Sequence, residues 1–400
     1  MAFLSATLDR IGASPTVAMS NRAAEMKAAG RDVIALAAGE PDFNTPDHII
    51  AAAHAAAEAG KTRYTAVDGI PELKAAIAAK FARENALSYA HSEISVGSGG
   101  KHVIWNAFLA TIEPGDEVII PAPYWVSYPD MVQFSAGVPV ILPCGLAQGF
   151  RLRPEDLAAA ITPRTKWIIL NSPGNPTGAG YTAAELSALA DVIRPHGQVH
   201  VMADDIYEHI TFPGFSFATL AAVAPDLKDR VLTVNGVSKA YAMTGWRLGY
   251  AGGPAPLIAA MRKLQSQSTT NPSSISQWAG VAALSGPQDY LETSRAAFLR
   301  RRDLVVTELN AMEGIECPTP QGAFYVYPSV AGLIGRRSPA GQVMADDRAI
   351  AEALLDETGV ALVFGAAFGL SPHVRLSYAA ADDVLKDALA RMAEFVKGCQ

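Results

Sequence analysis

The chain has 400 residues, of which 50% are hydrophobic and 18% are charged, a composition typical of a globular protein with two or three domains. Its formal net charge of −7, with no extended basic run, argues against nucleic acid as a partner. The three cysteines are widely spaced and have neither metal-ligand spacing nor a disulfide pattern. We therefore expect no metal site and a reducing, cytoplasmic location.

Two segments of the sequence bear on membrane targeting. The N-terminal stretch MAFLSATLDRIGASPT lacks the basic and apolar regions of a signal peptide. Residues 131–150 carry no charge, but their glycines and prolines indicate a helix end, a strand and a loop rather than a membrane span. We expect no membrane association.

Helical and strand-like segments alternate between residue 46 and about residue 300. Helices are predicted at 46–60, 71–86 and 101–112. Short apolar strands are predicted at 116–123, 138–143, 165–173, 199–205, 231–239 and 246–253. Near-continuous apolar strands are typical of a parallel sheet that helices cover on both faces. The pattern therefore predicts an open α/β domain over residues 46–300.

The pattern changes after residue 300. A charged helix leads to FYVYP, a second helix, the strand HVRLSYA and a closing helix. This order predicts a smaller α+β domain formed by residues 301–400, with residues 1–45 as an N-terminal arm that contributes to it.

Polar residues follow several predicted strands, and ligands of open α/β sheets bind beyond such strand ends. Asp204 and Asp205 follow the strand VHVM, and strand alternation predicts that one faces the sheet end and the other the surface. NSPGNPTG (171–178) follows another strand, although its turn-forming residues also suit an ordinary loop. VGSGGKH (96–102) could present backbone N–H groups to an anion at a helix start, a weak signal by itself.

Lys239 follows the strand VLTVNGVS and has Tyr241, Met243 and Trp246 close by in the sequence. The alternative is a surface lysine whose stem lies over apolar residues while its ammonium stays in water. Apolar surroundings lower the pKa of an ammonium group, and a lysine that attacks a carbonyl needs its neutral amine. The strand-end position favours a nucleophilic lysine.

Nine motifs occur in this order: GEPDFNTP, RYT, VGSGGK, PYWVSYP, NSPGNPTG, DDIYEH, SKAYAMTGWRLGY, GAFYVYP and HVRLSYA. With them the chain resembles, over essentially its whole length, the class I aminotransferases of fold type I, which use pyridoxal phosphate. Within that family it resembles the bacterial aspartate aminotransferase subgroup, which includes aspartate/prephenate relatives. The resemblance implies a large domain with a mostly parallel seven-stranded sheet between helices, plus a smaller α+β domain.

The resemblance also implies which residues bind the cofactor. Lys239 would form the Schiff base and then carry the proton between the substrate and the cofactor. Asp204 would pair with the pyridine nitrogen. The other implied contacts are stacking by Trp125, hydrogen bonds from Asn175 and Tyr207, and phosphate contacts from Gly99, Gly100, Lys101, Arg247, Ser238 and a partner subunit's Tyr64. Gly236 stands where the family often has a serine that contacts the phosphate. Either Ser238 replaces that contact or the contact is missing.

For the substrate, the resemblance implies that Arg375 binds the α-carboxylate with its rigid fork. Gly39 would permit close approach of the backbone, and Trp125 and Asn175 would also contact the substrate. A second carboxylate would meet Thr16 and Lys101, with Ser266 and Thr270 contributed by the second subunit of a homodimer whose active sites are shared.

The predicted function is transfer of the amino group of L-aspartate or glutamate to a 2-oxo acid such as 2-oxoglutarate or oxaloacetate. Gly12 stands where relatives that aminate prephenate carry a lysine, which argues against that activity. The alternatives are an aminotransferase with prephenate, aromatic or alanine preference and a C–S lyase. A non-catalytic regulator domain is the least expected, because the N-terminal arm leaves no room for a DNA-binding domain.

Overall fold

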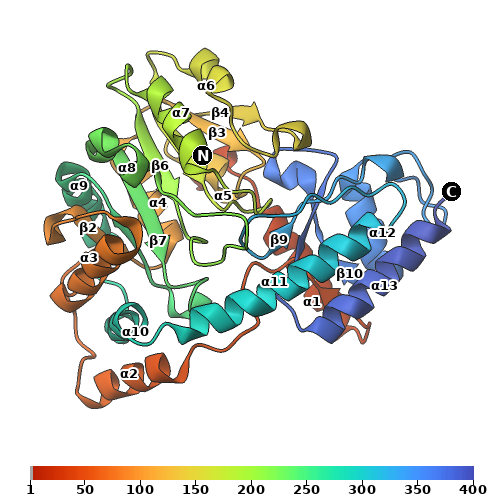
Figure 1. The fold of residues 1–400 in the computed structure, drawn as a ribbon, viewed down its shortest axis with the longest axis horizontal. Coiled ribbons are helices and arrows are strands. Elements are labelled where there is room, and N and C mark those ends of the chain that lie inside the picture. Colours follow the sequence, from red (N-terminus) through yellow and green to blue (C-terminus); the bar gives the residue numbers. More distant parts are fainter. Residues whose placement is uncertain (1–2) are drawn as a thin grey trace.

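The computed structural model describes residues 3–400, and one large sheet and two small sheets organise its fold (Figure 1). The large sheet has the order β2-β8-β7-β6-β5-β3-β4, and every strand is parallel to the others except β8, which is antiparallel to both of its neighbours. Its strands are β2 (Ile94–Gly97), β3 (Glu117–Ala122), β4 (Val138–Pro143), β5 (Thr165–Asn171), β6 (His200–Asp204), β7 (Val231–Gly236) and β8 (Gly249–Gly252). The predicted seven-stranded, mostly parallel sheet is confirmed.

Helices cover both faces of this sheet because successive side chains of a strand point to opposite faces. On β5, Ile168 and Leu170 pack into one apolar cluster, whereas Trp167 and Ile169 pack into the other. The first cluster lies under α3 (Pro71–Asn85), α6 (Pro154–Ala160), α7 (Ala183–Ile193), α8 (Leu220–Val223) and α10 (Ser274–Ser285), with α2 (Asp47–Glu58) packed against α10. The second lies under α4 (Gly100–Thr111), α5 (Ser127–Phe134) and α9 (Ala255–Ser266).

A second core lies beside the large sheet, on the right of Figure 1. It contains the antiparallel sheet β11-β12-β9 and the parallel pair β1-β10. The strands are β1 (Ile34–Ala35), β9 (Tyr325–Val326), β10 (Val360–Ala361), β11 (Val363–Phe364) and β12 (Val374–Ser377). The helices are α1 (Pro15–Ala28), α11 (Asp289–Asn310), α12 (Asp347–Thr358) and α13 (Asp382–Gly398). The pairing of β1 with β10 joins the N-terminal arm to the C-terminal region, in agreement with the predicted smaller α+β unit.

The connection between the two regions is the long helix α11, which runs through the predicted boundary at residue 300 (Figure 1). The exact boundaries at residues 45 and 300 remain predictions. Short 3₁₀ helices connect other elements: Ala6–Arg10, His91–Glu93, Leu146–Gln148, Pro225–Arg230, Thr244–Trp246, Ala331–Leu333 and Gly365–Phe368. Within residues 3–400, every helix is too short or too polar to cross a membrane.

A buried ion-pair network ties α3 to the segment that follows β6 and to the end of β7. Lys80 is fully buried and donates hydrogen bonds to Glu208 and, at 2.7 Å, to Asn85. Asn235 at the end of β7 also donates to Glu208, at 2.7 Å. The network thus joins three segments through a single carboxylate, which helps to fix the ends of β6 and β7 relative to each other.

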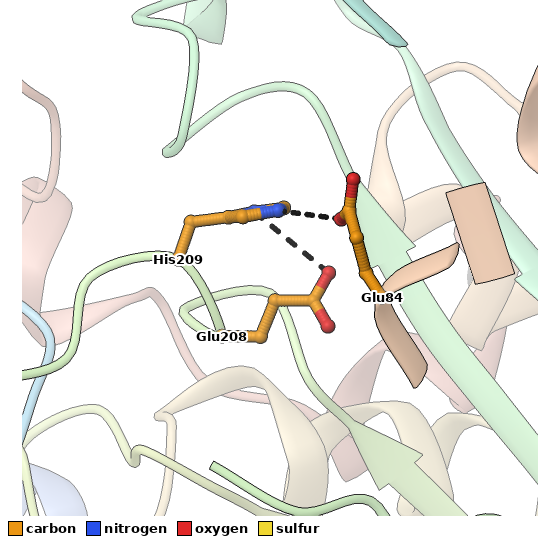
Figure 2. A group of neighbouring side chains, drawn as sticks. All are labelled: Glu84, Glu208 and His209. Atoms are coloured by element: carbon orange, nitrogen blue, oxygen red, sulfur yellow. Dashed lines mark hydrogen bonds and ion pairs between the residues drawn. The ribbon is translucent and has the colours of Figure 1, made fainter. Parts of the chain in front are cut away.

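Figure 2 shows the edge of this network, where the His209 ring lies between the carboxylates of Glu84 and Glu208. These three side chains could by geometry hold a cation. The Lys80 ammonium already fills that role, because it bonds Glu208 and lies 3.6 Å from Glu84. Burial raises the pKa of Glu84, but its hydrogen bond to His209 and the charge of Lys80 outweigh burial and lower that pKa to about 2. We therefore interpret the cluster as an ion-pair network.

Replacing Lys80 should destabilise the fold strongly. In Lys80→Met, Glu208 is left as a buried carboxylate without its cation, and removing one partner of a buried pair costs about 3–5 kcal/mol. Urea unfolding measures this loss. Lys386→Met makes the same chemical change on the exposed face of α13 and should stay within about 0.5 kcal/mol of the wild type. Equal losses in the two variants would contradict a structural role for the network.

Candidate active site

A cavity of about 450 Å³ lies at the carboxyl ends of β5, β6 and β7, where the two cores meet. This is the location that the topology of an open parallel sheet favours for a ligand. The cavity collects most of the residues that the sequence singled out, although they come from segments far apart in the chain: Thr16, Gly39, Gly100, Lys101, Trp125, Asn175, Asp204, Tyr207, Ser238, Lys239, Arg247 and Arg375.

Lys239 follows β7 and directs its amine into the cavity, where Nζ donates a 2.6 Å hydrogen bond to the carbonyl oxygen of Gly39. Burial lowers the pKa of this ammonium to about 8, with the charges of Arg247 and Arg375 acting in the same direction. The charge of Glu40 opposes them. The neutral amine is therefore far more accessible at neutral pH than that of a solvated lysine, as a nucleophile or proton carrier requires.

Asp204 is the last residue of β6, and its side chain is buried at the base of the cavity. The hydroxyl of Tyr128 donates to its Oδ2 at 2.5 Å, and the backbone N–H of Ile206 donates to its Oδ1 at 3.3 Å. Burial raises the pKa of Asp204, while the Tyr128 hydrogen bond acts against the rise. A cationic group bound beside this carboxyl would therefore stabilise its charged form strongly.

Asp205 corrects one expectation. Its side chain does not line the cavity, as the alternation of the strand predicts, but it is not at the surface either, because it is only 3% exposed. The reason is that helices cover both faces of the sheet, so both directions lead into the protein interior. Burial raises the pKa of Asp205 well above its usual value.

Arg375 on β12 enters the cavity from the small antiparallel sheet and is 3% exposed. Its guanidinium donates to Asn175 Oδ1 at 3.0 Å and to the carbonyl oxygen of Ala37 at 2.6 Å, and it lies 4.7 Å from the centre of the Tyr325 ring. Its Nε has no hydrogen-bond partner, and within residues 3–400 no carboxylate pairs with it. A buried guanidinium without an anion is a receptor for a carboxylate.

Hydrogen bonds hold both Asn175 and Tyr207 in place in the cavity wall. The backbone N–H of Asn175 donates to Asn171 Oδ1 at 2.8 Å, and Asn171 in turn donates to the carbonyl oxygen of Asp204 at 2.8 Å. The Tyr207 hydroxyl lies 3.1 Å from the hydroxyl of Tyr325. The loop NSPGNPTG is therefore fixed to the end of β6, which an ordinary surface loop would not be.

The start of α4 forms a cradle suited to an anion. The His102 N–H donates to the Gly99 carbonyl oxygen at 3.0 Å, which leaves the N–H groups of Gly100 and Lys101 without a backbone partner among residues 3–400. The Arg247 guanidinium lies against Gly99, where an added Cβ would come within 2.5 Å of Nη2. Gly99 has φ +91°, which favours glycine. Arg247 itself has φ +52°, an uncommon conformation for a residue with a side chain. Backbone N–H groups and a guanidinium at one point make a phosphate-sized anion site.

Lys101, Trp125 and Thr16 lie together at the cavity edge. The Lys101 ammonium lies 4.9 Å from the centre of the Trp125 ring, and burial, followed by the charge of Arg247, lowers its pKa. Thr16 is in the first turn of α1 and is hydrogen-bonded to Ser14 at 2.9 Å. This edge therefore offers one cation and a hydroxyl to a second anionic group.

Four predicted residues do not line the cavity of the single chain. Gly99 is one, and it borders the site through Arg247. Tyr64 is 90% exposed, Thr270 is exposed, and Ser266 is half-buried at the end of α9. A contribution from these last three requires a second chain, as the sequence-based prediction assigned them.

Sequence reasoning missed several side chains that line the cavity: Tyr128, Tyr325, Glu40, Thr244, Asn171 and Ser20. Tyr128 lies in the motif PYWVSYP, three residues after Trp125, and its place in that motif is the signal that could have identified it. Tyr325 lies in the motif GAFYVYP, whose repeated aromatics gave no reason to choose one. The Thr244 hydroxyl donates to Glu40 at 2.8 Å, a contact over 204 residues that the sequence does not indicate.

Together these groups place a reactive amine, a buried acid, an anion cradle and a guanidinium clamp around one cavity.

Comparison with known proteins supports this description. The family of class I and II aminotransferases matches residues 31–392. The chain is 62% identical to the aspartate/prephenate aminotransferase of Cereibacter sphaeroides (strain ATCC 17029 / ATH 2.4.9) over 398 residues, which cover 100% of both chains.

Two solved structures share the fold. One is the aspartate aminotransferase of Rhizobium meliloti, with a TM-score of 0.97, 52% identity and 100% of both chains covered. The other is the aspartate aminotransferase of Thermus thermophilus with maleate, with a TM-score of 0.92 and 45% identity over 99% of this chain and 100% of that one.

Proposed function

The chain belongs to the class I and II aminotransferases, and on this premise we propose that it transfers the amino group of L-aspartate or glutamate to a 2-oxo acid with the help of pyridoxal phosphate. The observation that carries the proposal is that the Lys239 amine and the unpaired Arg375 guanidinium share one cavity. A carboxylate bound at Arg375 brings the α-nitrogen of an amino acid toward the amine.

The residues of the cavity fit pyridoxal phosphate. The cradle formed by the start of α4 and Arg247 suits its phosphate, and an added Cβ at Gly99 would fill that cradle. The buried carboxyl of Asp204 lacks a cation, which a protonated ring nitrogen supplies. Trp125 offers an aromatic face for stacking, and Asn175 and Tyr207 offer hydrogen bonds to the ring oxygen. Ser238 precedes Lys239, is buried and lines the same cavity, where its hydroxyl would contact the phosphate.

When bound, this cofactor supplies a carbonyl carbon that takes up the amino group and a ring that accepts the electron pair of the broken Cα–H bond. The chain supplies the remaining steps. Arg375 binds and orients the α-carboxylate, and Gly39 leaves room for it because a Cβ there would come within 2.8 Å of the Tyr325 hydroxyl. The Lys239 amine would take the proton from the substrate Cα and pass it to the cofactor carbon that takes up the amino group. Asp204 would keep a proton on the ring nitrogen.

The preference for a dicarboxylic donor rests on the cavity edge. Lys101 and the Thr16 hydroxyl offer a cation and a donor to a second carboxylate, and the related Thermus thermophilus structure contains maleate, a dicarboxylate. A panel of amino donors with 2-oxoglutarate, oxaloacetate and prephenate as acceptors tests this. We expect the highest kcat/KM for aspartate and glutamate. A preference for alanine, or release of pyruvate and ammonia from cysteine without an acceptor, would refute it.

Prephenate is a second candidate acceptor because the relative from Cereibacter sphaeroides carries both activities in its name. The absence of a lysine at Gly12 argued against it, yet Gly12 is exposed and does not line the cavity of the single chain, so this position by itself does not decide the acceptor. The same panel of substrates shows whether the chain accepts prephenate in addition to 2-oxoglutarate and oxaloacetate. Amination of prephenate at a rate comparable to that of 2-oxoglutarate favours the dual activity.

The proposed active unit is a homodimer, and the wide exposure of Tyr64 supports it. If Tyr64 completes the site of the partner, a Tyr64→Ala chain mixed with a Lys239→Ala chain forms mixed dimers with one site that has both residues. We expect two nearly inactive homodimers to regain activity on mixing, and light scattering to give twice the chain mass. A fully active monomer, or mixing without any gain, would contradict the shared site.

A further inference from the structure

Cations outnumber carboxylates among the charged side chains that line the cavity. Lys101, Arg247 and Arg375 present cations to the positions of the carboxylates and the phosphate. Glu40 and Asp204 are the only carboxylates among the described residues that line it. Asp204 is buried at the base and bonded to Tyr128, so Glu40 is the acid that faces the open part of the cavity.

Glu40 is fixed next to the reactive amine. Its Oε2 accepts a 2.8 Å hydrogen bond from the Thr244 hydroxyl, which lies five residues after Lys239. The preceding residue, Gly39, accepts the hydrogen bond from Lys239 Nζ at 2.6 Å. The Gly39 carbonyl oxygen thus accepts the hydrogen bond of the Lys239 amine, and the charge of the Glu40 carboxylate acts to raise the pKa of that amine. Both acceptors favour a positively charged nitrogen at this position.

The amino donor must bring its nitrogen close to the Lys239 amine, because the cofactor carbon that takes up the amino group would lie beside that amine. The donor arrives with an ammonium group, whereas the 2-oxo acid has an uncharged carbonyl oxygen at the same position and the same carboxylates. The two substrates of the proposed reaction therefore differ by one positive charge beside Glu40. An anion close to the transferred nitrogen attracts the ammonium group of the amino donor and repels the 2-oxo acid, which carries the same carboxylates without that positive charge.

We propose that Glu40 distinguishes the amino donor from the 2-oxo acid acceptor, because its carboxylate receives the ammonium of the donor and repels the more anionic acceptor. Thr244 acts as a positioning residue that holds this carboxylate toward Lys239. This role rests on the proposed aminotransferase function and assigns it a specificity residue outside the groups that bind cofactor and carboxylates.

The test compares the two half-reactions in the holoenzyme. In Glu40→Gln the ratio of KM for aspartate to KM for 2-oxoglutarate should rise by about threefold or more, a size typical of a partly exposed charge pair. Thr244→Val should shift the KM ratio in the same direction but by less. Thr244→Ser keeps the hydroxyl and should have the same KM ratio as the wild type. An unchanged ratio in Glu40→Gln would overturn the proposal.

A matched control and a binding measurement sharpen the result. Glu58→Gln removes the same charge from an exposed position on α2 that does not line the cavity, and a ratio shift as large as that of Glu40→Gln would overturn the proposal. Succinate carries two carboxylates and no ammonium, so calorimetry should show equal or tighter binding to Glu40→Gln than to the wild type. Weaker binding would also overturn it. Absence of transfer by the wild type would instead refute the proposed function.

Discussion

Lys239→Ala should lose at least about 10³-fold in kcat, because both the nucleophilic amine and the proton carrier are removed. The bound cofactor should also lose the visible absorption that depends on its link to a lysine amine. Stopped assays and absorption spectra of the same preparation measure the two effects. The reason is local, because Lys239 lines the cavity and, among residues 3–400, its amine is hydrogen-bonded only to the Gly39 carbonyl oxygen.

Two controls separate this effect from a general loss of structure. Lys263→Ala removes an exposed lysine on α9 and should leave both the activity and the spectrum unchanged. Added methylamine should restore part of the activity of Lys239→Ala, because a small free amine can enter the space left by the side chain. Unchanged absorption in Lys239→Ala would show that the cofactor is attached elsewhere and would remove Lys239 from its proposed role.

Asp204→Asn should reduce kcat by about 10²-fold or more, the size expected when one preorganised charged group is removed from a site that excludes water. A neutral amide cannot hold the proton on the ring nitrogen, although it keeps the shape of the carboxyl. Asp205→Asn should change kcat by less than about tenfold, because that side chain does not line the cavity. Steady-state kinetics with aspartate and 2-oxoglutarate measure both variants, and equal losses would contradict the assigned orientation.

The sequence predicted the cavity well where a strand ends in polar residues. Parallel strands place their carboxyl ends at one edge, so Asn175, Asp204 and Lys239 had to meet once the strand pattern was recognised. Arg375 enters from a different sheet, and no spacing rule places it there. Its prediction depended on the resemblance to the family, as did those of Gly39 and Thr16 in the N-terminal arm.

Contacts between side chains distant in the sequence could not be predicted. The hydrogen bond from Tyr128 to Asp204 joins α5 to β6, and that from Thr244 to Glu40 joins the Lys239 loop to the N-terminal arm. The paired strands β1 and β10 have two residues each, too few to show alternation. The burial of Asp205 depends on helices that cover both faces of the sheet, whereas strand alternation alone only indicates that it points away from Asp204.

The most direct test of the central claim follows the nitrogen atom itself. The purified holoenzyme is incubated with ¹⁵N-labelled aspartate and 2-oxoglutarate, and the products are followed by mass spectrometry. Amino transfer through this cavity predicts ¹⁵N-labelled glutamate and oxaloacetate in equal amounts. Label released as ammonia, or glutamate that stays unlabelled while aspartate is consumed, would contradict the aminotransferase function proposed for this chain.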